Sequence, residues 1–127
     1  MDIFTHFAVG FATGTVIDKP ITCGVIAILP DVFLFSFKRL KNPTILYKIS
    51  HTVWIPLFIC IFNPIYALAY LSHIVLDVFT HGGKWKTEPF LPIKLNFGNF
   101  HEWEFFNKSY LIGLIISILW ITIFLYI

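Results

Sequence analysis

The stretch Ser72–His81, SHIVLDVFTH, sets three metal-capable side chains into an apolar run that extends from Ile65 to Phe79. His73, Asp77 and His81 recur at every fourth position. Positions four apart lie on one face of an α-helix, with Cβ atoms about 5–6 Å apart. A buried carboxylate or imidazole costs several kcal/mol unless it is paired or coordinates a metal. The stretch therefore predicts an apolar helix whose polar stripe binds a divalent cation.

The spacing of the stripe also bears on how many ions it binds. At about 1.5 Å per residue, His73 and His81 are about 12 Å apart along a helix, whereas zinc ligands lie about 2.0–2.2 Å from the metal. We therefore expect Asp77 to bridge two ions about 3.5–4 Å apart, with a histidine on either side. The alternative is a hydrogen-bonded structural stripe or a proton relay, because intramembrane His and Asp also form these.

The composition is typical of a membrane protein. The chain has 127 residues, enough for a single domain, and is 57% hydrophobic and 13% charged, whereas soluble domains carry about 25% charged residues. The net charge of +2 indicates no specific nucleic-acid partner. Cys23 and Cys60 lie in apolar segments without a Cys-x-x-Cys pattern, so we expect both to be small buried hydrophobes.

Five apolar segments predict an all-α fold, a multi-helix integral membrane bundle of about four to five helices. They cover residues 3–17, 20–37, 46–62, 64–79 and 109–127. The last segment has 19 uncharged residues and fits a transmembrane helix best. We divide the single domain into a metal-binding helical core at 1–83, a loop at 84–108 and the C-terminal transmembrane helix at 109–127.

Glycine and proline refine this outline. Gly10-x-x-x-Gly14 permits close helix packing, Pro30 is expected to break the second segment, and Asn63-Pro64 marks a turn. Residues 82–108 contain Gly82-Gly83, Pro89, Pro92 and Gly98, many aromatic residues and most of the remaining charges. They predict a long ordered loop, with a short strand at 93–97.

The distribution of cations predicts a topology. If all five segments span, eight of the nine Lys and Arg residues share one face and only Lys19 lies opposite. The positive-inside rule then places that face, the N-terminus and the metal site on the cytoplasmic side of the inner cell membrane. The candidate ligands fall on the same face, which the segment boundaries did not presuppose: His6, Asp31, His51, His73, Asp77 and His81.

Several of these candidates also have ordinary structural explanations. An Asp after Pro, such as Asp31, is usually a turn or cap residue, although a carboxylate inside a hydrophobic segment favours function. His6 and His51 taken singly are typical of structural histidines, and Asp2 is typical of a helix cap. His101-Glu102-x-Glu104 reads as solvated surface, with a supplementary ligand or general acid as the alternative.

The sequence resembles the small membrane-bound proteins described as predicted metal-dependent hydrolases. The Ser-His-x-x-x-Asp-x-x-Thr piece is the most specific match, and the matches cover about the first 90 residues in the family's order. The matching pieces are Thr5-His6-x-x-x-Gly10-x-x-x-Gly14, Leu29-Pro30-Asp31, Ser50-His51, Ser72-His73-x-x-x-Asp77-x-x-Thr80-x-x-Gly83 and Pro89-Phe90. The family is in turn distantly similar to zinc-dependent phospholipases C and fungal-type single-strand nucleases.

This resemblance implies a ligand set. Asp31, His51, His73 and Asp77 would surround one ion; His6, Asp77 and the chain's N-terminus would hold another, and His81 would begin a third site. The soluble enzymes complete that third site with a later His-x-x-x-Asp/Glu pair, where this chain has His101 followed by Phe105. The departure favours one or two ions over three.

The leading hypothesis is a membrane-bound hydrolase that uses one or two divalent metal ions, with zinc preferred. Asp31 or Asp77 would orient a water or take its proton, and the expected substrate is a phosphoester of a phospholipid type near the headgroup layer. The expected partner is the lipid bilayer. The alternative is a non-enzymatic membrane protein whose cluster binds a structural metal or relays protons or ions.

Overall fold

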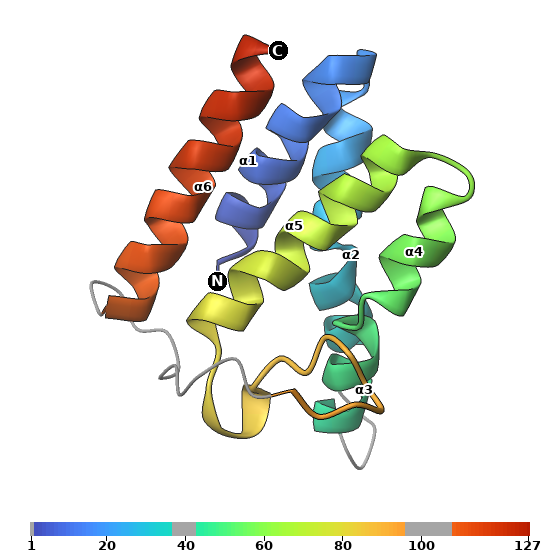
Figure 1. Ribbon diagram of the computed structural model, residues 1–127, viewed down its shortest axis with the longest axis vertical. Coiled ribbons are helices and arrows are strands. Elements are labelled where there is room, and N and C mark those ends of the chain that lie inside the picture. The colour runs from blue at the N-terminus through green and yellow to red at the C-terminus, as the bar shows by residue number, and fades with distance from the viewer. Residues whose placement is uncertain (1, 37–42, 96–107) are drawn as a thin grey trace.

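The computed structural model describes residues 2–36, 43–95 and 108–127. Within these ranges the chain is entirely helical and has no strand, which confirms the all-α prediction (Figure 1). Two single-turn 3-10 helices, η1 (Thr15–Ile17) and η2 (Gly83–Trp85), accompany the α-helices. The α-helices are α1 (Ile3–Gly14), α2 (Pro20–Ser36), α3 (Pro43–Ser50), α4 (Trp54–Cys60), α5 (Pro64–Thr80) and α6 (Lys108–Tyr126).

Helix α5 lies at the centre of the molecule and packs against α1, α2, α4 and α6. In Figure 1, α1 and α6 lie on one side of α5 and α4 lies on the other. The side chain of Asn63 accepts hydrogen bonds from the first backbone N–H groups of α5, and Pro64 occupies its first turn. The predicted turn at Asn63-Pro64 and the predicted fourth helix are therefore confirmed.

Helices α1 and α2 pack closely where the glycine spacing predicts it. A Cβ atom at Gly10 would meet the Cβ of Ala27 and would lie 2.6 Å from the carbonyl oxygen of Cys23. A Cβ at Gly14 would lie 2.6 Å from the carbonyl oxygen of Lys19. Only glycine allows the two backbones to approach this closely.

The expectation that Pro30 breaks the second segment is wrong. Helix α2 runs through Pro30 to Ser36 and carries Asp31 on a continuous helix. Proline removes one backbone hydrogen bond and crowds the carbonyl four residues earlier. Tertiary packing compensates for this cost, because α2 contacts both α1 and α5 and Pro30 itself is buried.

The third segment, predicted as one helix over 46–62, is divided into α3 and α4. At the break, three side chains contact the carbonyl oxygens of nearby residues. Ser50 Oγ donates to the Tyr47 carbonyl, Thr52 Oγ1 donates to the Ile49 carbonyl, and His51 Nδ1 lies 2.8 Å from the Tyr47 carbonyl. Such local bonds compete with helix formation. Pro56, in the first turn of α4, lacks the N–H that would have continued α3 into α4.

The loop after α5 folds back over α3 and α4. The Lys48 ammonium pairs with Glu88 at 2.8 Å, and the Val53 N–H donates to the Pro89 carbonyl at 2.8 Å. Residues 93–95 lie in a bend and irregular backbone, not in the predicted strand, and the remainder of that strand at 96–97 lies outside the described residues. His101, Glu102 and Glu104 also lie outside them.

One helix of the described residues, α6, is long and apolar enough to cross a membrane, judged by length and composition alone. The other apolar helices are shorter, at 10–17 residues. The helix boundaries therefore give no support to a multi-pass bundle, and they say nothing of which side of a membrane each end occupies.

Candidate metal centre

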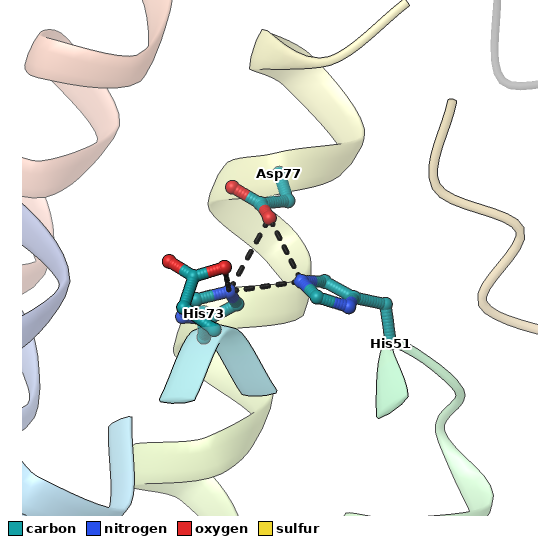
Figure 2. Close-up of side chains that lie close together, drawn as sticks. His51, His73 and Asp77 are labelled. Atoms are coloured by element: carbon teal, nitrogen blue, oxygen red, sulfur yellow. Dashed lines mark hydrogen bonds and ion pairs between the residues drawn. The ribbon is translucent and has the colours of Figure 1, made fainter. Parts of the chain in front are cut away.

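Four candidate ligands from three parts of the fold converge beside α5. Asp31 comes from α2, His51 from the turn between α3 and α4, and His73 and Asp77 from successive turns of α5. Their ligand atoms all lie within 4.8 Å of one another. Figure 2 shows His51 and His73 pointing toward the carboxylate of Asp77. His51, His73 and Asp77 are fully buried, whereas the Asp31 side chain is 19% exposed.

Backbone contacts determine which nitrogen of each buried imidazole carries hydrogen. His51 Nδ1 lies 2.8 Å from the Tyr47 carbonyl, and His73 Nδ1 lies 2.7 Å from the Ala27 carbonyl. A carbonyl oxygen can only accept, so each Nδ1 must donate. In a neutral imidazole, the other nitrogen, Nε2, then presents a lone pair.

The unprotonated atoms face one another. His51 Nε2 lies 3.0 Å from His73 Nε2, and Asp77 Oδ2 lies 3.0 Å and 3.3 Å from these two nitrogens. In the neutral form of both imidazoles, with hydrogen on Nδ1, neither Nε2 carries a hydrogen. In that state the lone pairs of the two nitrogens and of Asp77 Oδ2 face one another, and a bound cation would satisfy them.

The donor set fits a metal in a second respect. Metal-binding histidines generally donate their other N–H to a carbonyl or carboxylate, which fixes the ring orientation. His51 and His73 both do this through Nδ1. Mixed imidazole and carboxylate donors suit zinc among the transition metals, and also manganese or iron.

The second oxygen of Asp77 faces a second pair of histidines. Oδ1 lies 3.1 Å from His6 Nε2 and 3.1 Å from His81 Nδ1. The carboxylate therefore stands between two groups of nitrogen atoms, as a bridging role requires. His81 follows the last residue of α5 and has an extended backbone, so it reaches Asp77 from the helix end and not from the helical face that the sequence predicts.

His6 differs from His51 and His73 in its outer contacts. Its ring stacks on His73, with centroids 3.7 Å apart, and it is fully buried. Among the described residues no group bonds its Nδ1. Nothing equivalent to the Tyr47 and Ala27 carbonyls therefore fixes the tautomer of His6, and the second group of nitrogens is less organised than the first.

All six histidines and aspartates predicted from the sequence thus gather around Asp77, while their roles as ligands stay predictions. Asp2 caps α1 as expected, since its Oδ1 accepts from the Thr5 N–H at 2.9 Å. Cys23 is buried as predicted, but the prediction for Cys60 is wrong, because Cys60 lies on an exposed side of α4.

Tyr47 is a site residue that sequence reasoning missed. It is 2% exposed, and its hydroxyl lies 3.3 Å from Asp77 Oδ2 and 2.9 Å from Thr87 Oγ1. Its ring stacks on His51 at 3.9 Å between centroids. The signal in the sequence was its position four residues before His51, on the same face of a helix.

Tyr47→Phe is expected to weaken metal binding by about 10–100-fold, the usual loss when an outer-shell partner of a ligand is removed. The ring and its stacking on His51 remain, so the change removes only the hydrogen bonds of the hydroxyl. Competition with a metallochromic chelator measures the affinity. Tyr70→Phe is the matched control, because the buried Tyr70 hydroxyl donates to the Ser50 carbonyl and not to a ligand. An equal loss in both variants would indicate general loosening.

Comparison with known proteins does not assign a function to this cluster of residues. The chain matches no protein-family model, and no curated protein or solved structure is significantly similar to it. The class of site, a candidate centre of histidine and aspartate ligands, is therefore defined by the positions of its own residues.

Proposed function

We propose that this chain is a membrane-associated, metal-dependent hydrolase with one or two divalent ions, zinc being preferred. The observation that carries the proposal is the convergence of the Nε2 atoms of His51 and His73 on Asp77 Oδ2, with Asp31 Oδ1 3.7 Å from His73 Nε2. Buried acceptors that face one another are unfavourable unless a cation or a proton lies between them. A second ion would lie on the opposite side of Asp77, beside His6 and His81.

The residues suggest a division of labour. A bound divalent ion would supply Lewis acidity and lower the pKa of water. Asp31 is the only one of the four clustered candidates whose side chain is not fully buried. It therefore stands where a substrate and a water would approach, and we assign it the orientation and deprotonation of that water. Asp77 would hold the metal group together from inside.

A location in the membrane is supported by the apolar exterior of the molecule. Helix α6 is long enough to cross a bilayer, and many of its side chains are exposed although they are apolar, among them Ile115, Leu119 and Ile123. The exposed surface of α4 is likewise apolar. We propose that the whole bundle lies in the inner membrane, with the N-terminus, the loop at 82–108 and the metal centre on the cytoplasmic side, as the cation distribution predicts.

The proposed substrate is a phosphoester of the lipid headgroup layer. Its support is the resemblance of the Ser72–Gly83 motif to the membrane-bound hydrolases and, more distantly, to zinc-dependent phosphoesterases. The choice rests on analogy. A centre of this composition would suit a phosphoryl oxygen, since divalent ions polarise such oxygens.

A second candidate function is a structural metal site or a relay of protons. Four protein donors close the tetrahedron of a structural zinc site, whereas catalytic sites keep a position open for water. The four clustered donors favour this alternative, and the partial exposure of Asp31 favours the catalytic one. Hydrolytic activity decides between them.

The test combines elemental analysis with a panel of phosphodiesters and phospholipids. Purified protein is expected to carry at least one transition-metal ion per chain and to hydrolyse at least one substrate, and His73→Ala is expected to lose both. Tyr70→Phe is the control, because the buried Tyr70 hydroxyl donates to the Ser50 carbonyl and not to a candidate ligand. Protein without metal would contradict the proposal as a whole, and bound metal without hydrolysis would favour the structural alternative.

A further inference from the structure

A groove with an entirely apolar lining lies between α4 and α5. Its volume is about 580 Å³, within the range of about 300–1,000 Å³ that is usual for small-molecule sites. Leu57 and Cys60 line it from α4, and Ala67 and Leu71 line it from α5. The only heteroatom among these side chains is the thiol sulfur of Cys60. A polar ligand would find no hydrogen-bond partner among them.

One end of this groove lies close to the metal centre. Three lining residues are two or three positions along the chain from a residue at or beside the centre: Val53 follows His51, Leu71 precedes His73, and Phe90 follows Thr87, which contacts Tyr47. A chain extends at most about 3.3–3.6 Å per residue, so each connection spans no more than about 7–11 Å. The groove residues of α5 lie on a different face of the helix from the ligands, so the loop after α5 is the segment that contacts both sites.

The loop after α5 joins the two sites physically. Thr87 bonds the Tyr47 hydroxyl of the metal centre at 2.9 Å, and three residues later Phe90 lines the groove. The bond between the Val53 N–H and the Pro89 carbonyl, 2.8 Å long, holds Phe90 against the groove. A molecule with a polar head and an apolar tail therefore finds both of its binding surfaces under one loop.

We infer that the groove holds one acyl chain of a phospholipid whose phosphoester lies at the metal centre. The inference rests on the proposed function and names its substrate as a lipid bound by its tail. A protein partner fits less well, because protein interfaces surround their apolar core with a polar rim. Around the groove the exposed side chains of α4 are also apolar, including Phe58 and Ile61.

Cys60 provides a direct probe of occupancy. It lines the groove and is exposed, whereas Cys23 is buried, so N-ethylmaleimide should alkylate one thiol per chain. In a steroid-based detergent without alkyl chains, a lysophospholipid is expected to slow alkylation saturably, by at least about tenfold. Ala67→Trp fills the groove and is expected to abolish any further protection. Phe62→Trp is the matched control, since Phe62 is exposed and does not line the groove.

A second variant covers the case in which Ala67→Trp fails to fold. Leu71→Phe keeps an apolar side chain of similar size and is expected to raise the half-protecting lysophospholipid concentration severalfold. Two outcomes would overturn the inference. Protection that does not saturate would reflect contact with bulk amphiphile, and protection that is unchanged in a folded groove variant would reflect lysophospholipid bound outside the groove.

The link to the metal centre is tested with a neutral alkyl glycoside of equal chain length. The lysophospholipid is expected to protect at a concentration about tenfold lower than the glycoside, and chelation of the metal is expected to remove this difference. Equal midpoints in metal-loaded protein would overturn the assignment of the groove to the substrate. If elemental analysis finds no metal while protection stays saturable, the proposed function fails and the groove remains an acyl-chain site.

Discussion

Asp77→Asn is expected to lose at least one metal ion per chain and to bind the remaining metal more than about 1,000-fold more weakly, a larger loss than the 10–100-fold typical of outer-shell changes. Both oxygens of Asp77 are in use: Oδ2 faces His51 and His73, and Oδ1 faces His6 and His81. The amide that replaces the carboxylate has one acceptor oxygen and no charge. Two nearby cations would then repel each other without the anion that screens them.

Elemental analysis and chelator competition measure both quantities, and activity on any substrate found should disappear with the metal. Asp31→Asn is the matched comparison, since the Asp31 carboxylate lies 3.7 Å from His73 Nε2, farther than either Asp77 oxygen lies from its histidines. Its effect on metal content should be smaller. Wild-type metal content and affinity in Asp77→Asn would show that the carboxylate is not a bridge, and the polar stripe would then be a hydrogen-bonded structural feature.

Gly10→Ala is expected to destabilise the protein by about 1–3 kcal/mol, in the range found for overpacked cores, and to lower the unfolding temperature by roughly 5–10 °C. In an open helix the same change would stabilise by about 1 kcal/mol. Here the new methyl group would lie 2.6 Å from the Cys23 carbonyl oxygen and against the Cβ of Ala27. Because these are atoms of the α2 backbone and its shortest side chain, the two helices must separate.

The displacement should also reach the metal centre, because the carbonyl of Ala27 accepts the hydrogen bond from His73 Nδ1. Thermal unfolding and metal titration of the same sample measure both effects. Gly24→Ala is the matched control: a Cβ there meets the ring of Phe7, at 2.7 Å, and a partly buried ring can rotate. If Gly10→Ala and Gly24→Ala melt alike, the close approach of α1 and α2 does not limit stability.

Local rules predicted the parts of the structure that depend on local chemistry. The four-residue spacing placed His73 and Asp77 on one face of α5, and Asn63-Pro64 marked where that helix begins. The spacing of Gly10 and Gly14 anticipated a close helix contact, although it did not name α2 as the partner. The 19-residue apolar run became α6, with bounds shifted by one residue.

The rest depends on contacts that no single segment contains. Pro30 argues locally for a break, but packing on α1 and α5 keeps α2 continuous. The run 46–62 is apolar enough for one helix, yet the side chains of Ser50, His51 and Thr52 bond their own backbone and divide it. The Tyr47 hydroxyl contacts Asp77 from α5 and Thr87 from the loop after α5, and neither partner belongs to the segment that contains Tyr47.

The meeting of lone pairs at the metal centre has a consequence for how long the protein survives in a cell. A ligand that binds only the folded state stabilises it by about 4 kcal/mol at a thousand times its dissociation constant. In chains that acquire no ion, the acceptor atoms in the core stay opposite one another. These chains unfold locally more often, and proteases remove them sooner. With the proposed ion bound, the abundance of this protein is expected to follow the supply of that cation, even when its synthesis is constant.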